Sequence, residues 1–408
     1  MVAAESEGAL AGLKVIDMTL MLAGPYASML LADQGAEVIK IEPVEGDYVR
    51  TVGPFRPDDK SHAFGGYFQS VNRNKFSVGL DLKKPEGREI LIDLVRRSDV
   101  LIENYRAGVM DRLGLSYEVL REANPRLVYG AVRGFGDPRT GRSPYADWPA
   151  YDVISQAMGG IMGITGESAA QPVKIGPGVG DIVPAMMCTV GVLAAVYRAK
   201  ETGQGQFVDV SMVDSVLALC ERIIYQYSYE QKVPQPEGHR HPFLTPFGII
   251  PCKDGHLTLA CHTDVFWARL CELMGKPELA SDPRLATEAA RRQYQDLVYD
   301  SIAEFTLSRT KHELLGIFGG HVPFSPVYTV ADIVKDPHFA ARNMIVSLEH
   351  PGCEGEFAVA GVPIKMTETP GTIRRRAPML SEHAAEVLAS IGIGDERLRD
   401  LKARGVVK

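Results

Sequence analysis

The sequence lacks the patterns that mark several common classes of protein. Its 408 residues include only six cysteines and no CxxC pair, which is too few for a disulfide-stabilised scaffold. The ten histidines form no HExxH motif, so we expect no metal site. The patterns GxGxxG, GxxxxGK[ST] and GxSxG are absent as well. Their absence argues against hydride transfer from a dinucleotide, phosphoryl transfer and serine-hydrolase chemistry.

Basic charge and long apolar segments are also scarce. Lys and Arg number 44 against 51 Asp and Glu, a net charge of −7, so the basic footprint of a nucleic-acid-binding protein is missing. The N-terminus, from Met1 to Leu13, has no apolar core and does not resemble a signal peptide. The most apolar run, Ile182–Tyr197, is shorter than the roughly 20 residues of a membrane span. We therefore expect a buried helix there, no membrane association and a cytoplasmic protein.

The first half of the chain alternates short apolar strands with helical segments. Helices are predicted at Pro25–Asp33, from about Asp81 with Pro85 in the first turn, and over the apolar run. The predicted strands are Leu13–Thr19, Glu37–Ile41, Val100–Glu103, Arg126–Arg133 and Phe207–Ser211. This order is typical of a parallel sheet with helices on both faces, as in α/β proteins.

A change of composition predicts a second domain. Residues Gln231–His241 are rich in proline and polar residues, as in a linker. A hairpin with strands Gly248–Cys252 and His256–Cys261 follows, and then mostly helices to about Gly319. We expect Val322–Val330 to return to the first domain, with a strand near Phe357–Val359 and a helix over Ser381–Ile391 completing it. The predicted domains are 1–231, a smaller α+β domain at 232–325, and 326–408 as the return to the large domain.

One glycine-rich segment, Lys174–Asp181, stands directly before the apolar helix. Its closely spaced glycines permit close approach of another group to the backbone. Asp181 has two interpretations that do not exclude each other. It can cap the helix by accepting a backbone hydrogen bond, or it can act as a carboxylate nucleophile that the helix N-terminus keeps ionised.

Motifs along most of the chain resemble one family. The resemblance runs from about Leu10 to the C-terminus, and it identifies the chain as similar to the class III CoA-transferases of the CaiB/BaiF type. The segments that carry it, in chain order, are LKVIDMT, AGPYASMLLADQGAEVIKIEP, SVNRNKFSVGLDLKKPEG, IENYRAGVMDRLG, NPRLVYGAVRGFG, GDIVPAMMCTVGVLAAVYRAKETGQGQFVDVSM, PVYTVADIVKDPHFAARNM and RAPMLSEHAAEVL.

The resemblance implies a function for Asp181. In the family, the aspartate of the GD pair at the start of the long apolar helix is the nucleophile, and Gly180-Asp181 matches that pair. It implies transfer of CoA from an acyl-CoA donor, with succinyl-CoA as the expected donor, to a carboxylic acid through aspartyl anhydride and aspartyl-CoA thioester intermediates. A carboxyl with a pKa near 3.9 is ionised at pH 7 and needs no general base. No permanently bound cofactor is implied, because CoA is a substrate.

The resemblance also implies a substrate site. Residues that match positions around the adenine and phosphates of CoA are Leu80, Lys83, Asn104, Tyr105, Arg106 and Arg112. Pro43 replaces a cation found in some relatives, and Arg50 could substitute for it. Residues that match the acyl pocket and the surroundings of the nucleophile are Leu20, Leu22, Ala23, Tyr151, Asp152 and Gly180. Leu20 and Leu22 stand where formyl-CoA transferases have His and Gln, which favours a larger acid with an apolar part.

Two other functions remain open at this point. Racemases of the same family use a histidine about thirty residues before the aspartate, and Tyr151 stands there instead. Because a tyrosine with a pKa near 10 is a poor base, transferase is favoured over racemase or isomerase. A CoA-binding subunit of a heteromeric transferase is the third interpretation. The resemblance implies a Rossmann-like large domain and an interlocked homodimer, and a heteromer with a homologous subunit is the alternative.

Overall fold

The computed structural model describes residues 8–351 and 353–408, so most of the segment inspected for a signal peptide lies outside it. The described chain forms two compact units. One contains the residues up to Ile161, Ile175–Tyr225 and Pro337–Lys408, and the other contains Met162–Lys174 and Gln226–Asp336. The second unit therefore begins and ends at other residues than the predicted 232 and 325, and it includes a short earlier segment.

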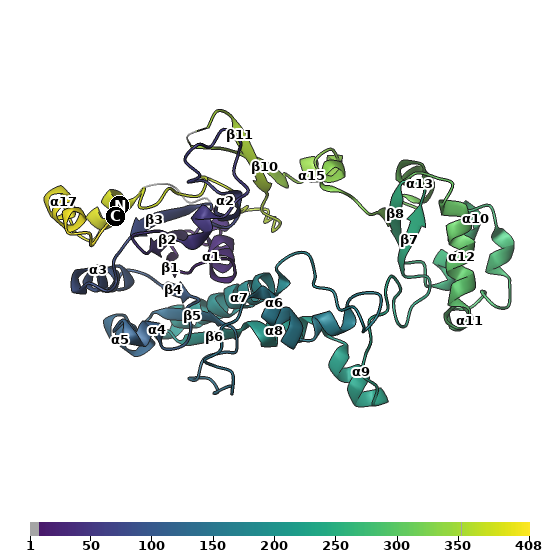
Figure 1. Ribbon diagram of the computed structural model, residues 1–408, viewed down its shortest axis with the longest axis horizontal. Coiled ribbons are helices and arrows are strands. Elements are labelled where there is room, and N and C mark those ends of the chain that lie inside the picture. Colours follow the sequence, from purple (N-terminus) through teal and green to yellow (C-terminus); the bar gives the residue numbers. More distant parts are fainter. Residues whose placement is uncertain (1–7, 352) are drawn as a thin grey trace. The chain divides into compact units, whose positions relative to one another are not determined.

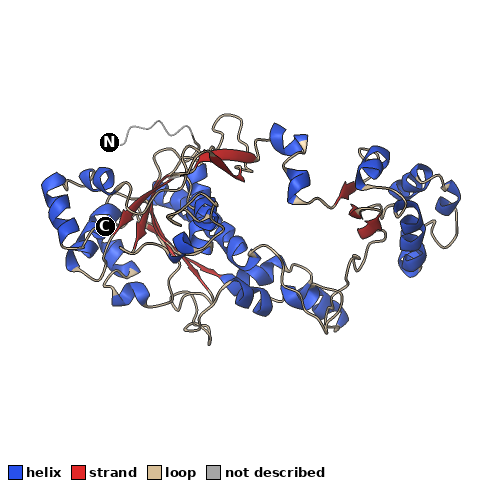
Figure 2. Ribbon diagram, turned by 45° about the horizontal axis from the view of Figure 1, so that its top comes forward, coloured by secondary structure: helices blue, strands red, loops and turns tan. Residues whose placement is uncertain are grey.

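The first unit is built on a six-stranded parallel sheet (Figures 1 and 2). Its order, β3-β2-β1-β4-β5-β6, is the 3-2-1-4-5-6 order of doubly wound dinucleotide-binding folds. In register, Ile16 lies between Ile39 and Leu101. The strands are β1 (Lys14–Met18), β2 (Glu37–Glu42), β3 (Lys75–Gly79), β4 (Val100–Glu103), β5 (Val128–Arg133) and β6 (Phe207–Ser211). The predicted α/β class and parallel sheet are confirmed, and β3 is a strand that the sequence analysis did not predict.

Helices cover both faces of this sheet. The helices of the first unit are α1 (Ala23–Asp33), α2 (Gly66–Val71), α3 (Pro85–Val95), α4 (Val109–Arg112), α5 (Tyr117–Ala123), α6 (Asp152–Met158), α7 (Val179–Thr202), α8 (Met212–Leu219), α15 (Pro337–Ala341), α16 (Ala384–Ala389) and α17 (Asp395–Ala403). The short 3₁₀ helix η1 (Tyr48–Thr51) belongs to the first unit, and a hairpin in it joins β10 (Ile345–Glu349) to β11 (Glu356–Ala360). A second 3₁₀ helix, η2 (Ile161–Ile164), begins at the last residue of the first unit's N-terminal segment and continues into the second unit.

Alternate residues of each strand enter different cores, as the twofold periodicity of a strand requires. On one face, Ile16 and Leu101 pack with Leu91 of α3 and Leu401 of α17. On the other face, Val15, Val100 and Ile102 pack with α1 and α7. Since both faces are buried, most residues of the strands are apolar, although charged residues such as Asp17 and Lys40 are buried among them.

The second unit has its own core. A three-stranded antiparallel sheet in the order β7-β8-β9 packs against helices, with Trp267, Leu270 and Phe318 fully buried. Its elements are β7 (Gly248–Cys252), β8 (Gly255–Leu259), α10 (Asp264–Leu273), η3 (Pro277–Ala280), α11 (Glu288–Gln293), α12 (Gln295–Thr306), α13 (Lys311–Phe318), β9 (Phe324–Pro326) and α14 (Val330–Ile333), while α9 (Ile223–Glu230) spans the boundary. The predicted hairpin is confirmed. The expected return to the first domain at Val322–Val330 is wrong, because β9 pairs with β8.

The long apolar helix α7 extends beyond the run expected from the sequence. It has 24 residues, and by length and composition alone it could cross a membrane, with a mean hydropathy of 1.9 over its most apolar window. A core helix of a soluble protein satisfies the same criterion. Ala185, Cys188 and Val192 lie in the core against the sheet, whereas Val190 and Tyr197 are exposed.

Candidate active site

Asp181 lies in the first turn of α7. The helix begins at Val179 with Gly178 as the N-cap residue, so Asp181 is the third helical residue and the predicted cap at Asp181 is wrong. Close contacts explain why glycine stands at positions 178 and 180. A Cβ on Gly180 would lie 2.4 Å from the Asp152 carbonyl oxygen, and one on Gly178 would lie 3.0 Å from Leu22 Cδ2. Glycine therefore allows the start of α7 to approach both α6 and the N-terminus of α1.

The carboxyl of Asp181 is not an ordinary surface acid. Burial, and second to it the negative charge of Asp152, raise its pKa from 3.8 to about 7. Both effects disfavour the charged form, and together they exceed the help that a helix N-terminus gives to an anion. The expectation of a carboxylate that is fully ionised at pH 7 is therefore wrong: near pH 7 the acid and its conjugate base coexist.

Asp152 is held in place at the start of α6. Its Oδ1 accepts a hydrogen bond of 2.8 Å from the backbone N–H of Gly180. Gln156 Nε2 donates hydrogen bonds of 3.0 Å to both carboxylate oxygens, and Gln156 Oε1 accepts a hydrogen bond of 2.9 Å from the Ile175 N–H. Asp152 thus ties the glycine-rich segment to α6 and positions the helix that carries Asp181.

A cavity of about 350 Å³ in the first unit is lined by Asp181. It brings together six of the predicted residues: Leu20, Ala23, Asn104, Tyr105, Arg106 and Tyr151. Tyr151 is 60% exposed. The lining also includes residues that the sequence analysis did not propose, among them Tyr67, Val132, Arg133, Trp148 and Met212. Leu22, Asp152 and Gly180 are outside the lining.

Tyr67, on α2, is one of the residues that sequence reasoning missed. Burial, followed by the charges of Asp181, Asp47 and Asp152, raises the pKa of its phenol to about 12. The hydroxyl therefore stays protonated at neutral pH and can donate a hydrogen bond within the cavity. Tyr67 lies far from the GD pair in the sequence and outside the motifs that carry the family resemblance, so no signal in the sequence indicated it.

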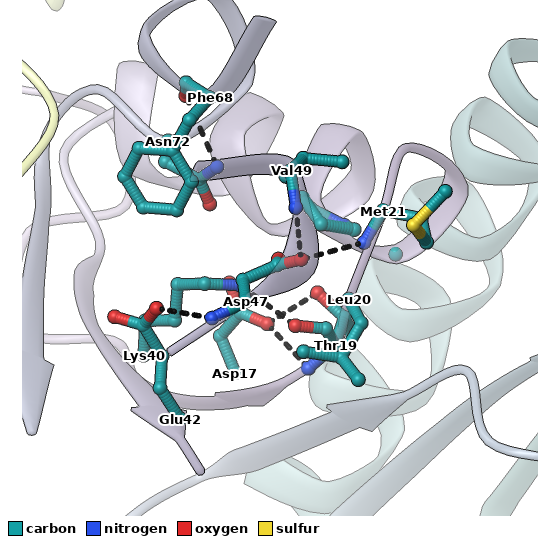
Figure 3. A network of polar contacts seen from close by, with 12 residues as sticks. Asp17, Thr19, Leu20, Met21, Lys40, Glu42, Asp47, Val49, Phe68 and Asn72 are labelled. Atoms are coloured by element: carbon teal, nitrogen blue, oxygen red, sulfur yellow. Dashed lines mark hydrogen bonds and ion pairs between the residues drawn. The ribbon is translucent and has the colours of Figure 1, made fainter. Parts of the chain in front are cut away.

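A network of buried charges binds the backbone of the loop after β1 (Figure 3). Lys40 Nζ donates 2.6 Å to the Thr19 carbonyl and lies 3.2 Å from Asp47 Oδ2. Asp47 Oδ1 accepts from the Met21 N–H at 3.4 Å. Met21 has a φ of 69°, a left-handed conformation that a non-glycine residue seldom adopts unless its surroundings require it. The network therefore fixes a strained loop that forms one wall of the cavity.

Other polar groups hold the same loop. Asn104 exchanges two hydrogen bonds with the backbone of Leu20, of 2.9 Å to Oδ1 and 2.7 Å from Nδ2. Although burial opposes it, Lys75 and Lys40 lower the pKa of Asp17 to about 2, and Asp17 Oδ1 accepts 2.9 Å from the Thr19 N–H. Asn104, predicted near the nucleotide, thus orients the acyl-pocket loop.

A second cavity, of about 430 Å³, contains the other residues that were predicted around the adenine and phosphates of CoA. Leu80, Lys83, Tyr105 and Arg112 line it, as does Pro43. Tyr105 lines both cavities. Burial and then the charge of Glu103 raise the pKa of Tyr105 well above its usual value. The two cavities therefore meet at the side chain of Tyr105. A long ligand with a charged end in one cavity and a reactive end in the other needs such an arrangement.

Arg50 does not take the place of the cation that Pro43 replaces. It is 7% exposed, bonds Glu42 through Nε at 2.8 Å and Nη2 at 2.7 Å, and donates 3.0 Å to the Pro378 carbonyl. Its guanidinium also stacks on Phe68, 3.7 Å from the ring centre. The expected phosphate contact is wrong, because all three nitrogens of this buried guanidinium already bind groups of the protein.

Metal ligands are not gathered at either cavity. Within residues 8–351 and 353–408, no group of three or more His, Cys, Asp or Glu side chains is placed to hold a metal ion. Among the described residues that line the first cavity, Asp181 is the only one with a carboxyl group. The lining of this cavity thus offers a carboxylate for the chemistry.

Comparisons with known proteins agree with this arrangement. Residues 10–384 match the model of CoA-transferase family III. The chain is 47% identical to the succinyl-CoA:mesaconate CoA-transferase of Haloarcula hispanica, over 95% of this chain and 97% of that protein. It is 37% identical to the formyl-CoA:oxalate CoA-transferase of Streptomyces avermitilis, over 98% and 99%. The crystal structure of a CAIB/BAIF family protein from Brucella suis superposes with a TM-score of 0.83 and 35% identity, over 94% and 99%.

The parallel sheet and the cavity at the start of α7 therefore define an α/β protein with the CaiB/BaiF fold. The chain belongs to CoA-transferase family III and is an enzyme of that class. CoA-transferases use CoA thioesters as substrates, so the chain acts on an acyl-CoA and an acid. The family resemblance predicted from the sequence is confirmed.

Proposed function

We propose that this enzyme moves CoA from succinyl-CoA to a short dicarboxylic acid, with Asp181 as the covalent carrier. The observation that carries the proposal is the position of Asp181: a carboxyl in the first turn of α7, lining a cavity that adjoins a second, cation-lined one. The similarity to a succinyl-CoA:mesaconate CoA-transferase supports the choice of donor and the class of acceptor.

Four attacks complete the exchange. The Asp181 carboxylate attacks the donor thioester carbonyl, forming a mixed anhydride and releasing CoA thiolate. The thiolate attacks the aspartyl carbonyl, giving an aspartyl-CoA thioester and the free donor acid. The acceptor carboxylate then attacks the aspartyl thioester, forming a second anhydride and again releasing the thiolate. Its attack on the acceptor acyl carbonyl yields the new acyl-CoA and restores the carboxylate, so one difficult step becomes several reversible ones.

The surroundings of Asp181 serve this chemistry in three ways. Burial destabilises the free carboxylate, so conversion to a neutral anhydride or thioester removes a charge that the site disfavours. The protonated Tyr67 phenol and the N-terminal amides of α7 are donors for charge that develops on tetrahedral intermediates. The apolar lining by Leu20, Met21 and Met212 excludes water, which would hydrolyse either intermediate.

In the same proposal, the second cavity holds the nucleotide end of CoA. Lys83 and Arg112 bind its phosphates, as a point charge and as a planar fork. Leu80 contacts the adenine, and Tyr105 lies where the chain of CoA passes between the cavities. CoA enters and leaves as a substrate, and we propose no permanently bound cofactor.

We also propose a homodimer in the cytoplasm. Helix α7 has a mean hydropathy of 1.9, yet only 39% of that window is buried within the chain. Met186, Met187, Val190 and Tyr197 are exposed along it. A second copy would cover this apolar face, and a homologous partner chain is the alternative that coexpression and mass measurement in solution would reveal.

The test is an exchange assay with purified protein. Succinyl-CoA is supplied with mesaconate, glutarate or oxalate, and the new CoA thioester is measured by chromatography. We expect exchange with the longer acids and none with Asp181→Ala, which should retain the fold and bind CoA. Near-normal exchange by Asp181→Ala would contradict the carrier role. Incorporation of solvent deuterium into a 2-methylacyl-CoA without any acceptor would instead support the racemase alternative.

A further inference from the structure

Arg133, the last residue of β5, is a buried cation in the wall of the Asp181 cavity. It is 6% exposed. Nη2 donates to Glu103 Oε1, and Nε lies 3.2 Å from Asp137 Oδ2. Nη1 is buried and makes no hydrogen bond to any part of the chain that the structure describes. Buried polar groups are nearly always paired, so an unpaired N–H on a residue that lines a cavity leaves this guanidinium able to take a partner from outside the chain.

The two carboxylates beside Arg133 are also shared with other donors. Glu103 Oε2 accepts a hydrogen bond of 2.7 Å from the Tyr105 N–H. Asp137 Oδ1 accepts from the Arg139 N–H at 2.9 Å and lies 3.3 Å from Arg139 Nη1. Burial, despite the opposing charge of Arg133, raises the pKa of Glu103 to about 7. The negative charge next to Arg133 is thus divided or reduced, which leaves its guanidinium able to bind a further anion.

The cavity lining matches an acyl group with a second carboxylate. Among its described residues the cations are Arg106 and Arg133, and the acid is Asp181. Arg106 is exposed, whereas Arg133 is buried. The walls near them are apolar, with Val132 and Met212 as examples. A methylene or vinylene segment fits such walls, and a distal carboxylate needs a buried cation to offset its loss of hydration.

We propose that Arg133 binds the distal carboxylate of the acyl group through Nη1 and so determines the preference of the enzyme for dicarboxylic over monocarboxylic substrates. This inference rests on the proposed function. Arg133 is a specificity-determining residue: it orients the acyl group while Asp181 reacts with the other end. It acts on the donor and the acceptor alike, because both acyl groups pass through the same cavity.

The test compares two donors that differ only in the distal group, succinyl-CoA and butyryl-CoA. Each is mixed with the enzyme without acceptor, and the rate of adduct formation on Asp181 is followed by mass spectrometry as a function of donor concentration. We expect the wild-type enzyme to prefer succinyl-CoA by about 10- to 100-fold, the range expected for a charge-assisted hydrogen bond. In Arg133→Met the preference should fall to within about threefold of unity, through loss of the succinyl rate, while the butyryl rate stays.

Two further variants keep the result interpretable. If Arg133→Met does not fold because Glu103 is left without its cation, the double variant Arg133→Met/Glu103→Gln removes both charges and should show the same lost preference. Arg139→Met is the matched control: it removes a cation from the other side of Asp137 but lies outside the cavity lining, and it should keep the preference.

The outcomes separate this inference from the function on which it rests. A wild-type enzyme that forms both adducts at equal rates, or an Arg133 variant that keeps the preference for succinyl-CoA, would overturn the role of Arg133 alone. A wild-type enzyme that turns over but forms no Asp181 adduct from either donor would overturn the aspartyl mechanism, and the inference with it.

Discussion

The substitution Asp152→Asn should make Asp181 a stronger acid. Two effects raise the pKa of Asp181 from 3.8 to about 7, and burial is the larger of them. The rise is about 3 pH units, or roughly 4 kcal/mol against ionisation. The charge of Asp152 therefore accounts for less than half, so removing it should lower the pKa by up to about 1.5 pH units. Asparagine retains an oxygen that can accept the hydrogen bond from the Gly180 N–H.

The assay is the pH dependence of kcat/KM for the acyl-CoA donor, which reports groups of the free enzyme. Because the ionised carboxyl is the nucleophile, the wild-type value should rise with pH and level off above about pH 7. In Asp152→Asn that rise should move to lower pH. The matched control is Asp147→Asn, which changes a carboxylate that is 82% exposed and should leave the profile in place. An acid limb that stays unmoved or moves to higher pH in Asp152→Asn would refute the reasoning.

Three other substitutions test the surroundings of the site. Gly180→Ala forces a Cβ to 2.4 Å from a carbonyl oxygen and should lower kcat by about 100-fold, whereas Gly176→Ala, which meets nothing within 4 Å, should keep it within severalfold in the same exchange assay. Asp181→Asn should raise the free energy of unfolding above pH 7 by about 2 kcal/mol, allowing for partial exposure. In the wild-type protein the raised pKa of Asp181 makes the folded state lose stability as the pH rises from 3.8 to about 7. Urea denaturation at pH 4 and pH 8 should therefore show the higher free energy of unfolding of Asp181→Asn only at pH 8. Asp47→Ala leaves buried Lys40 short of its partner and should cost about 3 kcal/mol in the same denaturation experiment; equal stability would show that the network is dispensable.

Much of the first unit follows from periodicity. Strands such as Val100–Glu103 and Val128–Arg133 are buried on both faces, and their runs of apolar residues identify them in the sequence. The strand β3 (KFSVG) was missed because its two large apolar residues are separated by Ser77 and preceded by Lys75, which is fully buried and paired with Asp17 at 2.9 Å. A buried lysine looks like a surface residue in the sequence, since its compensating charge comes from a distant strand. Tertiary partners of this kind cannot be inferred from local pattern.

The candidate site was only partly predictable for a similar reason. The GD pair before an apolar helix indicated Asp181, and family motifs indicated the residues of the two cavities. The pKa of Asp181 was not predictable, because it depends on burial and on the charge of Asp152. Asp152 lies 29 positions earlier in the sequence, and its close approach to the start of α7 depends on the absence of a side chain at Gly180. Tyr67 and Arg133 join the cavity through the topology of the sheet, so single-sequence inspection gave no reason to choose them.

The central claim is that the Asp181 carboxyl carries an activated group during turnover. The most direct measurement is mass spectrometry of the peptide that contains Asp181, after the enzyme is mixed with succinyl-CoA and quenched at times shorter than one turnover. The account predicts a mass increase on Asp181 corresponding to a CoA thioester or a succinyl anhydride, and its conversion to a hydroxamate by hydroxylamine. An unmodified Asp181 peptide throughout robust turnover would contradict it.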